Sequence, residues 1–119
     1  MDPLTIAAAY CRRAEARERD RIERFRKRRA QARGVALDLS ARFGDRIHVV
    51  MFGSLLDLDR FRLDSDIDLA VEGLSASEYW EALALVERQP AGARVDLIRI
   101  ESASAALRET VRQEGEVLS

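Results

Sequence analysis

The sequence predicts one α/β domain: a small mixed sheet with helices packed on one side, preceded by a long N-terminal helix rich in basic residues. Two observations support this fold class. Apolar residues recur at helical spacing over the first third of the chain, and three short segments with strand character follow, alternating with helical or turn segments. The total of 119 residues fits a single domain with a small core.

The first helix is expected to run from Pro3 to Phe43, because an aspartate precedes the proline and a glycine follows the phenylalanine. Gly34 is a candidate position for a kink or for a break between two helices. One helical face collects apolar side chains, although Arg29 falls on the same stripe. The apolar members of this stripe are Ile22, Phe25, Ala32, Leu39 and Phe43.

Three segments are predicted to form strands. The first, Arg46–Phe52, is rich in β-branched and aromatic residues, and Ala93–Ile100 has the same character. The second, Asp66–Glu72, alternates strictly, so that its apolar residues share one face while Asp66 and Asp68 share the other. The connection between the first two strands is too short for a crossover helix, so these strands are expected to be neighbours in a mixed sheet.

Two further helices are expected after the second and third strands. Serines provide candidate N-caps for both helices, with Ser75 or Ser77 for the first and Ser102 or Ser104 for the last. Apolar residues at helical spacing follow in each case. His48 and Trp80 are interpreted as packed side chains.

Charge is distributed unevenly along the chain. Residues 12–33 carry eleven basic and four acidic side chains, whereas the remaining residues carry nine basic and seventeen acidic ones. Three interpretations of this basic segment stay open. A solvated helix face with stabilising ion pairs is favoured, docking against an acidic partner subunit comes second, and direct nucleic-acid binding comes third.

Several classes of protein are disfavoured by the composition. No run of about 18 apolar residues occurs, so no membrane span is expected. The N-terminus has no positively charged segment before an apolar stretch, so a secretory signal is not expected. Cys11 is the single cysteine, which excludes an internal disulfide and a cysteine-based zinc site. We therefore expect a cytoplasmic protein.

Candidate metal ligands lie on two of the predicted strands. Asp66 and Asp68 would present two carboxylates about 6–7 Å apart on one strand face, where like charges are costly without a cation. Oxygen-rich sites of this kind suit Mg²⁺. Asp96 stands within an apolar strand segment, where aspartate is disfavoured by propensity. If the two strands are neighbours, Asp96 would complete a three-carboxylate cluster.

A candidate phosphate-binding turn follows the first predicted strand. Gly53 allows a sharp turn and close approach of the backbone to a ligand, and the Ser54 hydroxyl with nearby N–H groups could bind a phosphate. Such a turn beside a carboxylate metal site is typical of phosphoryl or nucleotidyl transfer. The nearby acids Asp57, Asp59 and Asp64 are interpreted as loop residues.

These motifs together resemble a known family. The pattern "FGS", then ten residues, then "SDIDLAVEGL", resembles the minimal nucleotidyltransferase branch of the DNA polymerase β-like superfamily. The later "VDLI" is similar to the strand that holds the third carboxylate in that family, and "LRETVRQEGEVLS" resembles its closing helix. The resemblance covers about residues 35–119. It therefore divides the chain into a basic N-terminal helix, 1–34, and a minimal nucleotidyltransferase domain, 35–119.

The resemblance implies an activity, a partner and roles for individual residues. The protein would transfer AMP from ATP to a hydroxyl, expected to be that of a tyrosine, on a HEPN-type toxin, and would act as the antitoxin in a hetero-oligomer. Gly53, Ser54 and Ser65 would bind the nucleotide. Mg²⁺ would be bound by Asp66, Asp68 and Asp96, and Asp96 could also be the base for the incoming hydroxyl.

One loop departs from the family pattern. Many relatives have Ala-Arg-Gly two residues after the serine, whereas this chain has "LLDLDRF", with Asp57 and Asp59 where a positive and a flexible residue are expected. Arg60 or Arg62 could supply the missing positive charge. The departure motivates an alternative, an antitoxin with little or no catalytic activity that neutralises its toxin by binding. A further alternative is a subunit of a small-molecule nucleotidyltransferase, such as an antibiotic-modifying enzyme.

Overall fold

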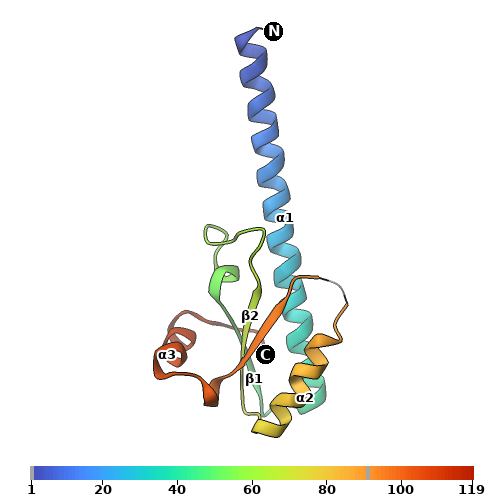
Figure 1. The fold of residues 1–119 in the computed structure, drawn as a ribbon, viewed down its shortest axis with the longest axis vertical. Helices are drawn as coiled ribbons and strands as arrows, with labels where there is room; N and C mark the ends of the chain where they lie inside the picture. The colour runs from blue at the N-terminus through green and yellow to red at the C-terminus, as the bar shows by residue number, and fades with distance from the viewer. Residues whose placement is uncertain (1, 91) are drawn as a thin grey trace.

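A long helix supports a small mixed sheet in the structure, a computed structural model that describes residues 2–90 and 92–119 (Figure 1). The first helix, α1 (Pro3–Phe43), packs on the sheet with its C-terminal half and projects away from it with its N-terminal half. The other elements, in chain order, are β1 (His48–Phe52), the 3-10 turn η1 (Gly53–Leu56), β2 (Ile67–Glu72), α2 (Ala76–Glu87), β3 (Val95–Arg99), the 3-10 turn η2 (Ile100–Ser102), α3 (Ala105–Glu114) and β4 (Glu116–Val117).

The predicted limits of α1 are confirmed. The Asp2 side chain accepts a hydrogen bond from the N–H of Leu4, and Gly44 ends the helix with φ 84°. The helix continues through Gly34 without a break, because buried residues on both sides of it pack against the sheet. The division of the chain at residue 34 therefore falls inside one helix, and as a division between functional parts it stays a prediction.

The sheet has the strand order β3-β2-β1-β4. The expected pairing of the first two strands is confirmed, and they run antiparallel, while β2 and β3 run parallel. The sheet is therefore mixed, as predicted. The fourth strand, β4, was not predicted, because its two residues are too few to show any periodicity; they pair with Val50 and Met51 of β1.

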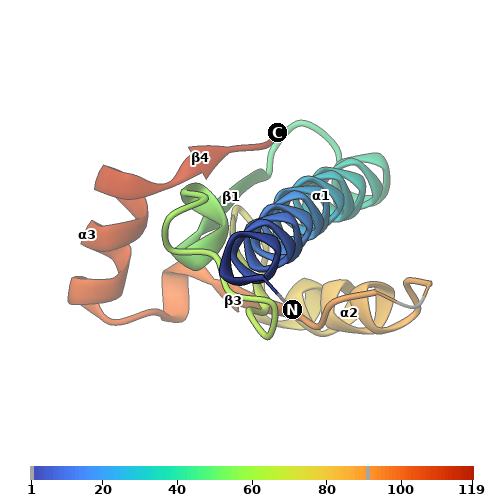
Figure 2. The ribbon, with the colours of Figure 1, turned by 90° about the horizontal axis from the view of Figure 1, so that it is seen from above.

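Helices cover both faces of the sheet, which corrects the prediction of a one-sided arrangement. Figure 2 shows α1 and α2 on one side and α3 on the other. Val49 and Met51 of β1 are fully buried in the core beneath α1 and α2. Val50 alternates with them and faces the opposite way. There it lies against Gly115, directly after α3, where any side chain would collide with Val50.

The caps of the two short helices resolve the alternatives among the serines. Ser75 caps α2 in a reciprocal capping box with Glu78, and Ser104 caps α3 by accepting from the N–H of Leu107. All three predicted strands are shorter than expected by one to three residues at one or both ends. Neither His48 nor Trp80 is packed, since both are exposed, so that interpretation was wrong.

No helix within the described residues is long and apolar enough to cross a lipid bilayer.

Candidate functional site

Three candidate carboxylates lie near one another at one end of the sheet. Asp68 pairs with Asp96 across the parallel strands β2 and β3, and it pairs with Phe52 across β1 and β2. Asp66 precedes β2 by one residue and lies two positions before Asp68, on the same side of the chain. Since neighbouring strands are about 4.8 Å apart, the register brings Asp66, Asp68 and Asp96 into one cluster.

The pKa of Asp68 reports the proximity of these carboxylates. Partial burial raises the pKa of Asp68 above its ordinary value, and the negative charges of Asp96 and then Asp66 raise it further. Asp66 and Asp96 are exposed, whereas Asp68 is half-buried. The cluster therefore holds like charges that oppose one another, and a bound cation would remove that repulsion.

Gly53 occupies a position that other residues could not adopt without strain. Its φ is +80°, in the left-handed region, and a Cβ atom at this position would collide with the carboxylate of Asp68. The glycine thus lets the backbone at the end of β1 pass directly beside the carboxylate cluster. Ser54 follows in η1, so the predicted phosphate-binding turn adjoins the predicted metal ligands.

Ser65 is engaged in the loop that leads to β2. Its hydroxyl accepts a hydrogen bond from the N–H of Arg62 at 3.1 Å, and its own N–H donates to the Arg62 carbonyl at 3.0 Å. These two bonds close a turn immediately before Asp66. A contact between Ser65 and a nucleotide stays a prediction.

The donor chemistry of the cluster fits Mg²⁺. Asp66, Asp68 and Asp96 offer only oxygen ligands, and their partial exposure leaves room for the water ligands that Mg²⁺ retains. Within residues 2–90 and 92–119, no three acidic, histidine or cysteine side chains are gathered as in a preformed metal site. Mutual repulsion among three carboxylates favours this open arrangement.

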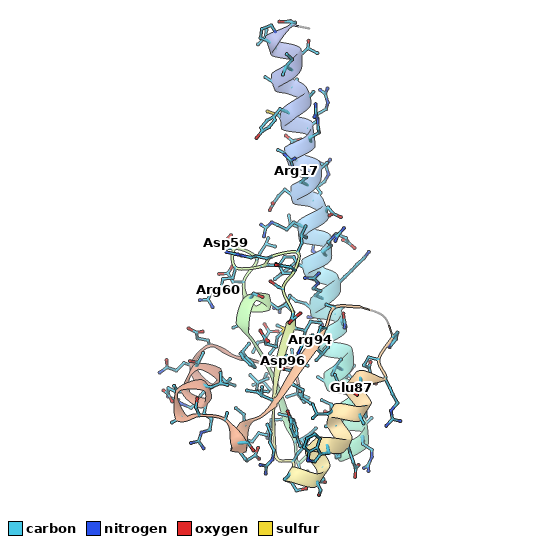
Figure 3. The ribbon with its side chains drawn as sticks, in the orientation of Figure 1. Arg17, Asp59, Arg60, Glu87, Arg94 and Asp96 are labelled. Carbon is cyan, nitrogen blue, oxygen red and sulfur yellow. The ribbon has the colours of Figure 1, made fainter. Side chains whose placement is uncertain are left out.

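Arg94 is a further candidate site residue, which the sequence motifs did not single out. The β2–β3 register places it across from Asp66, and its carbonyl accepts from the N–H of Ile67 at 2.8 Å. It lies two residues before Asp96, and Figure 3 shows the two residues next to each other at the start of β3. The same two-residue alternation that linked Asp66 to Asp68 could have identified Arg94 from the sequence.

A cavity of about 460 Å³ opens beside β3 and includes both Arg94 and Asp96 in its lining. Tyr79 contributes to its wall and donates a hydrogen bond to the carbonyl of Leu97 at 2.5 Å. Burial, and then the charge of Asp96, raise the pKa of Tyr79, so its hydroxyl stays protonated. The cavity thus runs along the edge strand β3, between that strand and α2, and reaches Asp96.

The remaining acids between β1 and β2 are loop residues, as expected. Asp57, Asp59 and Asp64 are exposed, and Asp57 accepts from the N–H of Asp59 at 2.9 Å. Arg60 lies 3.8 Å from Glu114 of α3. Figure 3 shows Asp59 and Arg60 on the outer part of the loop, apart from Asp96.

Comparisons with known proteins give matches among solved structures. No protein-family model matches the chain, and no curated protein matches it. One chain of a crystal structure described as a toxin-antitoxin with AMP-PNP is 26% identical, with 73% of this chain and 72% of that chain covered and a TM-score of 0.54.

Two variants of the complex described as the toxin-antitoxin MntA-HpeT also match. The first variant has two aspartates, two positions apart, replaced by glutamates; it is 26% identical, with 73% of this chain and 71% of that chain covered and a TM-score of 0.53. The second has a tyrosine replaced by alanine. It is 27% identical, with 71% of this chain and 68% of that chain covered and a TM-score of 0.52. The chain therefore has the nucleotidyltransferase fold that its motifs predicted and is structurally similar to the MntA antitoxin of toxin–antitoxin complexes.

Proposed function

We propose that this protein is a Mg²⁺-dependent nucleotidyltransferase that transfers AMP from ATP to a hydroxyl of a HEPN-type toxin and thereby acts as its antitoxin. The observation that carries the proposal is the strand register that sets Asp68 beside Asp96, with Gly53 against the Asp68 carboxylate. The similarity to a toxin-antitoxin structure with AMP-PNP supports ATP as the substrate.

Different residues would bind the Mg²⁺ and the triphosphate. Asp66, Asp68 and Asp96 would hold Mg²⁺, which when bound neutralises triphosphate charge and stabilises the leaving pyrophosphate. The backbone of Gly53 and Ser54 would lie against the triphosphate. The α-phosphate would then lie next to Asp96.

The transfer itself needs one proton acceptor. Asp96, exposed at the cavity, would take the proton of the acceptor hydroxyl. The hydroxyl oxygen then forms a bond to the α-phosphorus while the bond from that phosphorus to the pyrophosphate oxygen breaks. The products are an AMP-modified hydroxyl and pyrophosphate, and a tyrosine is the expected acceptor.

Arg94 would supply the positive charge beside the carboxylates that the family's arginine is expected to provide. Asp57 and Asp59 stand in the loop where the family resemblance leads us to expect an arginine, and Arg60 lies near the carboxylate of Glu114 instead. A guanidinium next to the carboxylate cluster can bind phosphate oxygens through a fork of donors. We assign this part to Arg94 in preference to Arg60 or Arg62.

The partner would form a hetero-oligomer with the chain in the cytoplasm, with residues 35–119 as the transferase part. The similar structures are described as toxin–antitoxin complexes, which supports a protein acceptor over a small molecule.

The direct test is label transfer. The full chain is incubated with Mg²⁺, ATP labelled at its α-phosphate, and the product of the neighbouring gene. We expect label on the partner protein with the wild type and with Asp57→Asn, and no label with Asp66→Asn combined with Asp68→Asn. Absence of transfer by the wild type, or undiminished transfer by the double variant, would refute the proposal.

One observation favours a second candidate, an antitoxin that acts by binding alone. Asp57 and Asp59 are exposed in the loop where the family resemblance leads us to expect an arginine. A toxin-neutralisation assay in cells separates the two. Full neutralisation by the Asp66→Asn, Asp68→Asn double variant would favour binding alone, and loss of neutralisation would favour catalysis.

A further inference from the structure

Three arginines of α1, namely Arg21, Arg28 and Arg29, donate hydrogen bonds to backbone carbonyls of the loop between β1 and β2. We infer that these residues, here called the arginine clasp, position the nucleotide-binding turn and Asp66 for the transfer reaction. The inference rests on the proposed function and assigns a role to part of the basic helix. The three arginines would act as positioning residues, not as ligands of the nucleotide.

Arg28 makes the most extensive contacts of the three. Its Nη1 donates to the carbonyls of Arg62 at 3.2 Å and Ser65 at 2.9 Å, and its Nη2 donates to the carbonyl of Leu63. Its guanidinium also lies 5.1 Å from the ring centroid of Phe61. One planar side chain therefore holds three loop carbonyls through two nitrogens in a fixed fork, a geometry that the three donors on the single nitrogen of a lysine do not reproduce.

Arg29 connects α1, the loop and the last strand. Its Nη1 donates to the carbonyl of Leu55 at 2.7 Å, and its Nη2 donates to both carboxylate oxygens of Glu116 at 2.8 Å. Only 18% of its side chain is exposed. A partly buried guanidinium with two sets of partners strongly favours one geometry, since unpaired buried charge is costly.

Arg21 holds the outer part of the loop. Its Nη1 donates to the carbonyls of Leu58 at 2.7 Å and Phe61 at 3.3 Å. Glu18, one turn earlier on the helix, accepts from its Nε at 3.0 Å and its Nη2 at 2.8 Å, which orients the guanidinium. The loop is thus held along its length as well as at its two ends.

The positions of these contacts connect the arginine clasp to the site. Leu55 directly follows Ser54, and Ser65 directly precedes Asp66. Arg29 and Arg28 therefore fix the peptide carbonyls next to the candidate phosphate-binding turn and next to a candidate metal ligand. A loop without such anchors would be more mobile, and small displacements of reacting groups are costly for catalysis.

Helix geometry explains why basic side chains occur on an otherwise apolar stripe. Arg21, Phe25, Arg28 and Arg29 have the spacing of one helical face, and Phe25 packs edge-on against Phe61 at 5.5 Å between ring centroids. The stripe continues toward the C-terminus into buried residues that pack on the sheet. The same face of α1 thus packs on the sheet with apolar side chains and on the loop with arginines.

Nη1 and Nη2 of both Arg28 and Arg29 already donate to loop carbonyls or to Glu116. This separates positioning from electrostatic attraction. If Arg28 acted only by attracting ATP, its charge would be sufficient, and Arg28→Lys would keep the activity that a neutral substitution such as Arg28→Gln loses. If Arg28 acts by positioning the loop, the planar fork is required, and Arg28→Lys would lose activity as well.

The experiment compares Arg28→Gln, Arg28→Lys and the control Arg26→Gln, which removes an exposed arginine from the same helix. Amide hydrogen exchange of residues 55–65, calorimetric binding of AMP-PNP with Mg²⁺, and kcat and KM for label transfer are measured on the full chain with its partner. Thermal melting by circular dichroism verifies folding, and Arg28→Lys serves alone if the glutamine variant does not fold.

We expect faster exchange in residues 55–65 and a fall of about 10- to 100-fold in kcat/KM for both Arg28 variants, with kcat affected as well as KM. Arg26→Gln should match the wild type. Kinetics of Arg28→Gln equal to those of Arg26→Gln, or full recovery by Arg28→Lys, would overturn the inference and leave the proposed function intact. A wild type that binds no AMP-PNP would overturn both.

Discussion

Asp68 and Asp96 lie across from each other in the parallel pairing of β2 and β3, separated by 28 positions in the sequence. Their side chains meet at the end of the sheet where Gly53 turns the chain. Two carboxylates held in register on neighbouring strands are unfavourable by themselves, and the negative charge of Asp96 helps to raise the pKa of the partly buried Asp68. This relationship leads to predictions about stability, metal binding and catalysis.

Asp68→Asn should stabilise the protein while abolishing transfer. The pKa of Asp68 is raised in the folded chain, so its ionised form is less favourable folded than unfolded. The penalty appears as pH rises through the unfolded pKa and is complete above the folded pKa. In EDTA at pH 7 we expect Tm to rise by roughly 2–5 °C, with a smaller rise at pH 4. Asp64→Asn, at an exposed loop residue, is the control. A Tm of Asp68→Asn below that of the wild type at pH 7 would contradict this prediction.

Mg²⁺ should stabilise the wild type through the same cluster. Binding to the folded state alone raises the free energy of unfolding, by about 2.7 kcal/mol when Mg²⁺ is at 100 times its Kd. Melting is followed with Mg²⁺ or with NaCl of equal ionic strength, before and after chelation. Asp66→Asn combined with Asp68→Asn should remove the difference in Tm between Mg²⁺ and NaCl. If the double variant shows the same difference in Tm as the wild type, Mg²⁺ binds at another site.

Two glycine-to-alanine substitutions should have opposite effects. Gly53→Ala forces a side chain into the left-handed region and against Asp68, so we expect a loss of about 1–3 kcal/mol and of transfer activity. Gly34→Ala is the matched control, because a Cβ there meets nothing within 4 Å inside α1, and it should gain about 0.5–1 kcal/mol. Urea unfolding measures both, and a neutral Gly53→Ala would exclude close contact with Asp68.

Arg94→Gln should weaken ATP binding without disturbing the fold. Loss of charge-assisted bonds to phosphate corresponds to about tenfold or more in KM, with a smaller effect on kcat. Arg108→Gln, an exposed arginine on α3, provides the control. If steady-state kinetics show equal KM values for the two variants, phosphate binding belongs to another residue, with Arg62 next in order.

Glu78→Gln should destabilise the protein in a pH-dependent manner. The hydrogen bond from Arg46, followed by the backbone N–H of Ser75, lowers the pKa of Glu78 to about 2. The stabilisation is therefore complete above the unfolded pKa of about 4.3 and is lost as pH falls toward 2. Urea midpoints should differ from the wild type at pH 7 and converge toward pH 3. The exposed Glu87 provides the control as Glu87→Gln, and a difference independent of pH would rule out this mechanism.

Much of the fold was predictable because its signals are local. The limits of α1, the capping serines and the alternation in β2 depend on residues only a few positions apart. The placement of α3 on the second face and the existence of β4 were not predictable in this way. Both depend on packing of Val50 against the segment near Gly115, more than 60 positions away.

Most residues of the candidate site were likewise predictable from local signals, and one was not. Gly53, Ser54, Asp66, Asp68 and Asp96 were identified from residue type and spacing, and their motifs resembled one family. Arg94 was missed although its spacing from Asp96 was visible, because one arginine before a strand has many possible roles.

By itself, the sequence determined the three helices, the three longer strands and the candidate residues for nucleotidyl transfer, because periodicity and residue type are properties of short segments. Only the tertiary structure decided that Asp68 pairs with Asp96 and that the arginines of α1 bind the loop carbonyls. Both relationships join segments at least 26 positions apart. They exist because burial of one shared core fixes the strand register and the direction in which each face of α1 points.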